Sequence, residues 1–191
     1  ASPTPFTNTT TTRSATTASD MYSFGLLAQF PHEFPCSTAA LQHVARLAAA
    51  FGGTSSLFVE VRHRTWNAQP ALAALAELGV GVLALDYPGM VGGFSRDVPG
   101  VLGPAHLAYL RLHGRNRAWF RHGALRDEVY DWRYSPDEVG QIAARIERLA
   151  ADGTRTLVVA NNHFQGKAMA VVEDLLAFFQ AQNVEGVMVY Q

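Results

Sequence analysis

The chain has 191 residues, of which 48% are hydrophobic and 16% charged, and its formal net charge is −1. This balance is typical of one soluble globular domain with a substantial core, and it excludes a globally basic nucleic-acid-binding surface. No apolar run approaches the roughly 18 residues of a membrane span, so we expect no membrane partner. The one cysteine, Cys36, excludes an internal disulfide and favours a cytoplasmic location.

The first residues differ in composition from the rest of the chain. Residues 1–22 are rich in Thr and Ser and hold few large apolar side chains. Such a segment cannot bury enough surface to order itself, and we interpret it as a disordered tail. The folded domain is expected to span residues 23–191.

Strand and helix patterns alternate from residue 26 onward. The strands are predicted at residues 26–30, 56–62, 80–86, 107–113 and 156–161, and the helices at 37–51, 70–78, 135–151 and 166–182. A loop rich in Gly and Pro replaces the helix between the third and fourth strands. The short segment 184–191 fits a further strand or a frayed end equally well. This order predicts an α/β fold of about five parallel βα units.

Polar side chains gather at the ends of the predicted strands. Alternation places Arg111 and His113 on one face of their strand and Leu110 and Leu112 on the other. The apolar face suits a covering helix, whereas burying the polar face is costly and needs a reason. The polar residues at these strand ends are Gln29, Glu60, Arg62, Asp86, Arg111, His113 and Asn161. Because parallel α/β folds build ligand sites at this edge, we expect these side chains to share one cavity.

Two kinds of chemistry fit this set. The candidate catalytic residues are Glu60, Asp86 and His113, which form an acid/base set or a partial site for a divalent metal, although no short motif assigns metal ligands. The candidate substrate-binding residues are Gln29, Arg62, Trp66, Arg111, Arg115, Asn161 and Asn162. Their arginines suit a phosphate or a carboxylate. The alternative is a structural ion network in which the two carboxylates pair with the arginines.

The segment from Arg111 to Arg133 offers a second interpretation. It holds six arginines together with Trp119, Phe120 and Trp132. Arginine interleaved with aromatic residues is a composition that binds single-stranded nucleic acid. Acidic residues dilute the charge, so an ordinary solvated loop on the rim of the sheet is the favoured reading and nucleic acid the alternative.

Four segments resemble signatures of the DUF72 (YecE-like) family. They are Phe-Val-Glu-Val-Arg-His-Arg-Thr-Trp at 58–66, Tyr-Leu-Arg-Leu-His-Gly-Arg-Asn at 109–116, Tyr-Asp-Trp-Arg-Tyr at 130–134 and Asn-Asn-His-Phe-Gln-Gly-Lys-Ala at 161–168. The resemblance covers about residues 26–182 and implies a TIM-barrel-like fold with no established activity. The family's opening Gly-Thr-Ser-Gly-Trp strand does not occur in this sequence. The chain therefore resembles the C-terminal two-thirds of the domain, five units of an eight-unit barrel.

Five units would form an incomplete barrel, an open curved sheet. Its two edge strands would lack partners, so we expect self-association through them. Three functions fit the sequence. The first is an enzyme acting on an anionic substrate by acid/base or metal-assisted chemistry, and the second is a non-catalytic module that binds an anion or nucleic acid. The third is a truncated product without activity.

Overall fold

A computed structural model describes residues 25–51, 55–89 and 93–184. In chain order its elements are β1 (Leu26–Gln29), α1 (Thr38–Phe51), β2 (Leu57–Glu60), α2 (Gln69–Glu77), β3 (Gly81–Val82), β4 (Ala84–Asp86), β5 (Leu107–Leu112), α3 (Arg126–Val129), α4 (Pro136–Leu149), β6 (Arg155–Ala160) and α5 (Lys167–Ala181). Short 3₁₀ helices lie at Arg64–Asn67, Pro104–His106, Arg117–Phe120, Ala151–Gly153 and Phe164–Gly166. The four predicted helices are confirmed. The predicted tail and nearly all of 184–191 lie outside the described residues.

The strands form two parallel three-stranded sheets, ordered β1-β2-β3 and β4-β5-β6. They correspond to the predicted run of five strands, except that the third strand is interrupted at Leu83, whose amide donates to the Val59 carbonyl at 3.0 Å. The interruption has a local cause. Val82 exchanges two 3.0 Å backbone hydrogen bonds with Val101, so β5 begins to pair only from Ala84 onward. One curved sheet is thereby divided into two.

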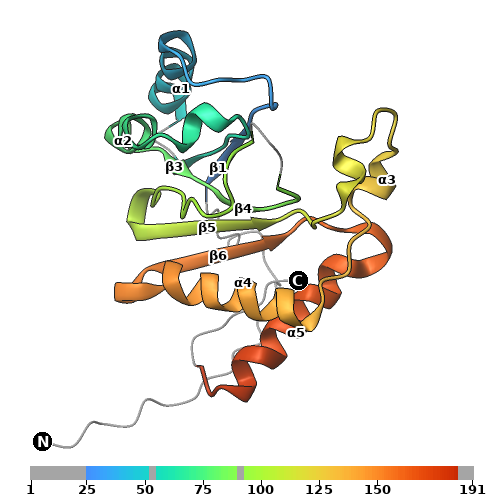
Figure 1. The fold of residues 1–191 in the computed structure, drawn as a ribbon. Helices are drawn as coiled ribbons and strands as arrows, with labels where there is room; N and C mark the ends of the chain where they lie inside the picture. The colour runs from blue at the N-terminus through green and yellow to red at the C-terminus, as the bar shows by residue number, and fades with distance from the viewer. Residues whose placement is uncertain (1–24, 52–54, 90–92, 185–191) are drawn as a thin grey trace, which may run out of the picture.

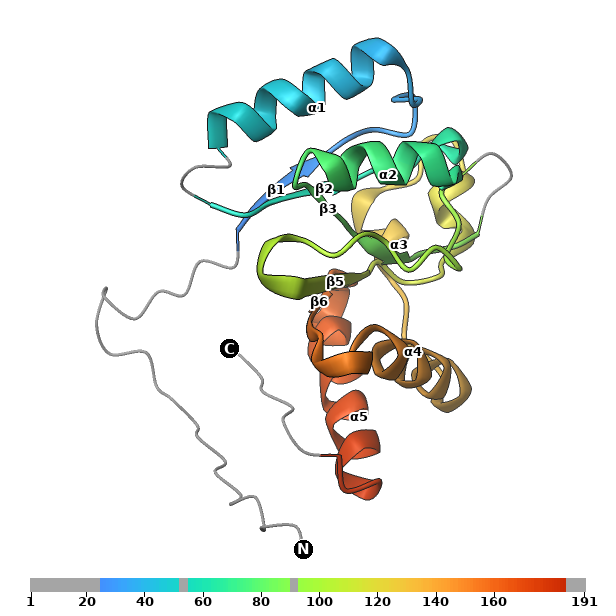
Figure 2. The same cartoon turned by 90° about the vertical axis from the view of Figure 1, so that its left-hand side faces the viewer.

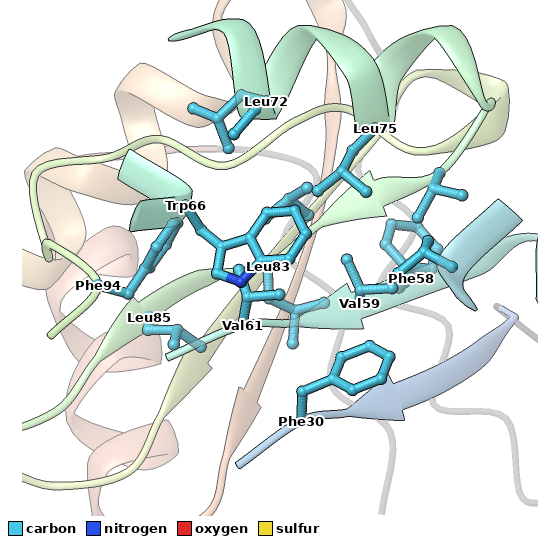
Figure 3. Packing of buried hydrophobic residues seen from close by; sticks show 14 of the residues in the cluster. Phe30, Phe58, Val59, Val61, Trp66, Leu72, Leu75, Leu83, Leu85 and Phe94 are labelled. Atoms are coloured by element: carbon cyan, nitrogen blue, oxygen red, sulfur yellow. The ribbon is translucent and has the colours of Figure 1, made fainter. Parts of the chain in front are cut away.

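The helices cover the two sheets separately. Figures 1 and 2 show α1 and α2 together beside β1, β2 and β3, while α4 and α5 lie beside β5 and β6. The first apolar core gathers around Val59, Trp66, Leu75 and Leu83 (Figure 3). The second contains Leu110, Leu112, Ile142 and Leu175 and lies under α4 and α5. Among the described residues the sheets do not close into a barrel, because β1 pairs only with β2 and β6 only with β5.

A long loop connects β4 to β5, as its Gly and Pro content predicts. Arg145 of α4 anchors this loop, because its guanidinium donates to the carbonyls of Leu85 at 2.7 Å and Val98 at 3.1 Å. In the part of the chain that the structure describes, no helix combines the length and the apolar character needed to cross a bilayer.

Candidate functional site

The two faces of β5 separate polar from apolar side chains as predicted. Leu110 and Leu112 are fully buried in the core under α4 and α5. On the opposite face, Tyr109 contacts the ring of Phe58 edge-on at 5.6 Å, and Arg111 reaches Glu60. The inner face of the curved sheet therefore carries the polar residues, and the outer face carries the core.

Glu60 is the centre of this polar group. Its side chain is fully buried at the end of β2. Oε1 accepts hydrogen bonds from Arg62 Nε at 2.9 Å and Nη2 at 2.6 Å, and Oε2 accepts one from Arg111 Nη1 at 2.6 Å. Charged partners on both oxygens compensate for the burial of the carboxylate, which would otherwise cost several kcal/mol.

Arg111 joins three strands through its guanidinium. Besides Glu60 on β2, Nη1 donates to Gln29 Oε1 of β1 at 3.1 Å, and Nη2 donates to Asn161 Oδ1, directly after β6, at 3.1 Å. The expected convergence of polar strand ends thus occurs for Gln29, Glu60, Arg62, Arg111, His113 and Asn161, hereafter the arginine cluster.

The protonation of His113 follows from its neighbours. Arg111 is a donor only, so the Asn161 oxygen faces it and the Asn161 amide nitrogen faces His113 Nδ1, 3.1 Å away. Nδ1 must then accept, which places the proton of the neutral ring on Nε2. That nitrogen lies 3.2 Å from Glu60 Oε1, although the two atoms are not aligned for a hydrogen bond.

The charges of the arginine cluster follow from the same contacts. Burial acts to raise the pKa of Glu60, but the close approach of His113 Nε2 and the positive charges around the carboxyl lower the pKa from 4.5 to about 2. Burial lowers the pKa of His113, against the opposing pull of Glu60, so the ring is neutral at neutral pH. Arg62 and Arg111 both favour the ionised form of Glu60, because guanidinium is always charged. The cluster therefore carries one net positive charge.

Donors also outnumber acceptors in this region. Arg111 Nε, His113 Nε2 and Trp119 Nε1 are buried atoms without a hydrogen-bond partner. All three carry a proton when His113 has the tautomer described above. Unpaired buried donors are rare in native structures because each one costs free energy, so their grouping needs an explanation.

Aromatic rings border the arginine cluster, although none of them was predicted as a site residue. The Arg62 guanidinium lies over the Trp119 ring, 5.1 Å from its centroid. Trp119 contacts Tyr130 at 5.6 Å and Tyr87 at 6.4 Å, and Tyr130 contacts His163 at 5.0 Å. All four rings follow the carboxyl ends of β4, β5 or β6. For Tyr87 and His163, that position shortly after a strand is the signal that could have selected them; Trp119 and Tyr130 lie further along the connection from β5 to α4.

Asp86 and Arg115 lie in a separate network, contrary to the expected shared cavity. Asp86 is in register with Leu112, whose side chain points to the outer face. Its carboxylate accepts hydrogen bonds from Arg115 at 3.0 and 2.8 Å and from the Tyr134 hydroxyl at 3.0 Å. Arg115 also donates to Glu138 of α4 at 3.3 Å, so this network ties β4 to that helix. Both faces of β4 are buried, and alternation alone could not identify the inner one.

Trp66 and Asn162 hold the scaffold. Trp66 is fully buried in the first core (Figure 3), and its Nε1 donates to the Phe34 carbonyl at 2.8 Å. Asn162 is equally buried, and its amide nitrogen donates to the Trp132 carbonyl at 2.8 Å. Neither side chain is hydrogen-bonded to Glu60. In the described ranges, no group of three or more His, Cys, Asp or Glu side chains is arranged to hold a metal ion.

This geometry defines a partial β/α barrel with a polar site at the carboxyl ends of its parallel strands. The chain belongs to the family described as protein of unknown function DUF72, whose model matches residues 15–188. The resemblance drawn from the four sequence segments is therefore confirmed.

Solved structures agree with this assignment. A DUF72 family protein from Thermotoga maritima shares 28% identity at a TM-score of 0.73, with 81% of this chain and 56% of that chain covered. One from Enterococcus faecalis shares 20% identity at a TM-score of 0.72, with 88% and 60% covered, and shows the fold alone. The chain thus spans less than two-thirds of the length of these relatives. A comparison with curated proteins gives no match.

Proposed function

We propose that the protein binds an anionic small molecule, bearing a phosphate or a carboxylate, through Arg62 and Arg111. The observation that supports this proposal is the excess of positive charge and of donors in the arginine cluster. Two guanidiniums share the single carboxylate of Glu60, and two buried donors beside them, Arg111 Nε and Trp119 Nε1, have no hydrogen-bond partner. An oxyanion would supply both the missing charge and the missing acceptors.

The contacts favour binding over acid/base chemistry by the carboxylates. Glu60, with a pKa of about 2, is a weak base and serves to align the two arginines. Asp86 is engaged by Arg115 and Tyr134. We assign His113 the role of a neutral donor, because Asn161 occupies its accepting nitrogen.

Nucleic acid is the less favoured ligand. Of the six arginines between residues 111 and 133, four are paired with carboxylates, namely Arg111 with Glu60, Arg115 with Asp86, Arg121 with Glu128 and Arg133 with Asp174. Paired arginines release fewer counter-ions from a phosphate backbone, so they contribute less to binding it.

Thermal unfolding in phosphate tests the proposal. Sodium phosphate should raise the melting temperature above that in sodium chloride of equal ionic strength. At a hundredfold excess of phosphate over Kd, the free energy of unfolding should increase by about 2.7 kcal/mol. The same melting temperatures measured in sodium acetate compare the stabilising effect of a carboxylate with that of phosphate. The variant Arg62→Gln should lose this gain, because it removes one of the two guanidiniums while Glu60 keeps Arg111.

The control is Arg133→Gln, at a half-exposed arginine paired with Asp174 on α5. It should keep the full phosphate effect. The proposal fails if phosphate and acetate stabilise the wild type no more than chloride does, or if Arg62→Gln retains the whole shift.

A further inference from the structure

The aromatic side chains beside the arginine cluster include Trp119, Tyr130 and His163. Trp119 and Tyr130 belong to neither apolar core and are only half-buried, so part of each ring remains open to solvent. They come from the connection between β5 and α4, whereas His163 follows β6. Two connections thus place rings next to the arginines at the same edge of the sheet.

Trp119 combines a ring surface with an unpaired donor. Its Nε1 is buried without a partner, although a buried indole N–H normally finds one. Its ring centroid lies 5.6 Å from that of His113, whose side chain is 1% exposed and whose Nε2 is also unpaired. The Arg62 guanidinium lies over the same indole. Donors for an oxyanion and surfaces for a planar group are therefore adjacent.

We infer that the ligand carries its phosphate or carboxylate on a planar aromatic ring. This inference rests on the proposed function and names the class of ligand. The oxyanion accepts hydrogen bonds from Arg62 and Trp119 Nε1, and the ring packs against Tyr130. Tyr130 suits this role because it is half-buried and its ring contacts those of both Trp119 and His163.

Calorimetric titration with three simple phosphates tests this class. Phenyl phosphate should bind about tenfold more tightly than methyl phosphate, as expected for one added aromatic contact. Cyclohexyl phosphate, which is apolar but not planar, should fall well below phenyl phosphate. In Tyr130→Leu the advantage of the phenyl group should disappear while methyl phosphate binds as before, and in Tyr130→Phe the advantage should remain.

The matched control is Phe120→Leu, at an exposed aromatic residue next to Trp119 in the chain. It should leave all three affinities unchanged. Equal affinities of the wild type for phenyl and methyl phosphate would overturn the inference and leave the anion site standing. A phenyl advantage that survives in Tyr130→Leu would also overturn it. Binding of none of the three phosphates would instead count against the proposed function itself.

Discussion

At the residue scale, Glu60 organises its surroundings because it is a single carboxylate between two arginines. Its two oxygens fix the guanidiniums of Arg62 and Arg111 in place, and Asn161 then fixes His113. The sequence predicted that these side chains meet, because each stands on the polar face near the end of a strand. It could not predict which atom bonds to which, since long side chains have many rotamers and the strand pattern constrains only the direction of the Cβ atom.

Glu60→Gln should make the protein less stable at neutral pH by about 3 kcal/mol. The lowered pKa has the same sign, and removing one partner of a buried ion pair costs about 3–5 kcal/mol. Because the folded-state pKa is lowered, this stabilisation is complete above about pH 4.5 and is lost as the pH falls through 2. Urea unfolding at a series of pH values should therefore show the wild type and Glu60→Gln converging in acid.

Glu173→Gln, at an exposed position on α5, serves as the control and should follow the wild type at every pH. His113 also makes the fold less stable in acid, and its effect begins at a higher pH than that of Glu60. Because the pKa of His113 is lowered in the folded protein, the unfolded chain takes up the proton first as the pH falls below 6.5. A difference between wild type and Glu60→Gln that stays constant down to pH 2 would contradict the assigned pKa of Glu60.

At the scale of elements, helix α4 shows what sequence patterns can and cannot reveal. A helix over residues 135–151 was predicted, and the structure has a full capping box at its start, in which Ser135 and Glu138 bond to each other's backbone amides. The function of Arg145 was not predictable. An arginine in the middle of an amphipathic helix normally faces solvent. Arg145 is instead 9% exposed and donates hydrogen bonds to two carbonyls, that of Leu85 in β4 and that of Val98 in the following loop.

Arg145→Met should therefore destabilise the protein by about 2–3 kcal/mol. Methionine keeps the aliphatic volume but leaves the carbonyls of Leu85 and Val98 without their donors, and each unsatisfied buried group costs about 1–3 kcal/mol. Arg148→Met, on the same helix at an exposed position, should change the free energy of unfolding by less than about 0.5 kcal/mol. Chemical denaturation of the two variants makes the comparison, and equal midpoints would contradict the anchoring role of Arg145.

At the scale of the whole molecule, the order and direction of the strands were predictable, but their division into two sheets was not. Alternating strands and helices force parallel neighbours, which the register confirms. The break at Leu83 depends on Val101, nearly twenty residues further along the chain and in a loop without a periodic pattern. Among the described residues β1 and β6 each have a neighbour on one side only, and these edges bear on how the chain should behave in solution.

We predict that this chain self-associates through the edge of β6. In a parallel strand, every second residue bonds to the same neighbour. The Asn161 amide donates to Leu112 of β5, so the amides of Thr156, Val158 and Ala160 point away from β5.

Thr156→Pro would remove one of these outward amides without breaking the ladder to β5, because proline lacks the N–H group that pairs strands. Thr156→Val keeps the amide and loses only the hydroxyl, which has no partner. Sedimentation velocity over a range of concentrations should show that the wild type and Thr156→Val associate. Thr156→Pro should associate about tenfold more weakly. This difference is expected from the loss of one strand-pairing hydrogen bond of about 1 kcal/mol together with a steric block at the edge. A wild-type chain that remains monomeric at every concentration would contradict this prediction.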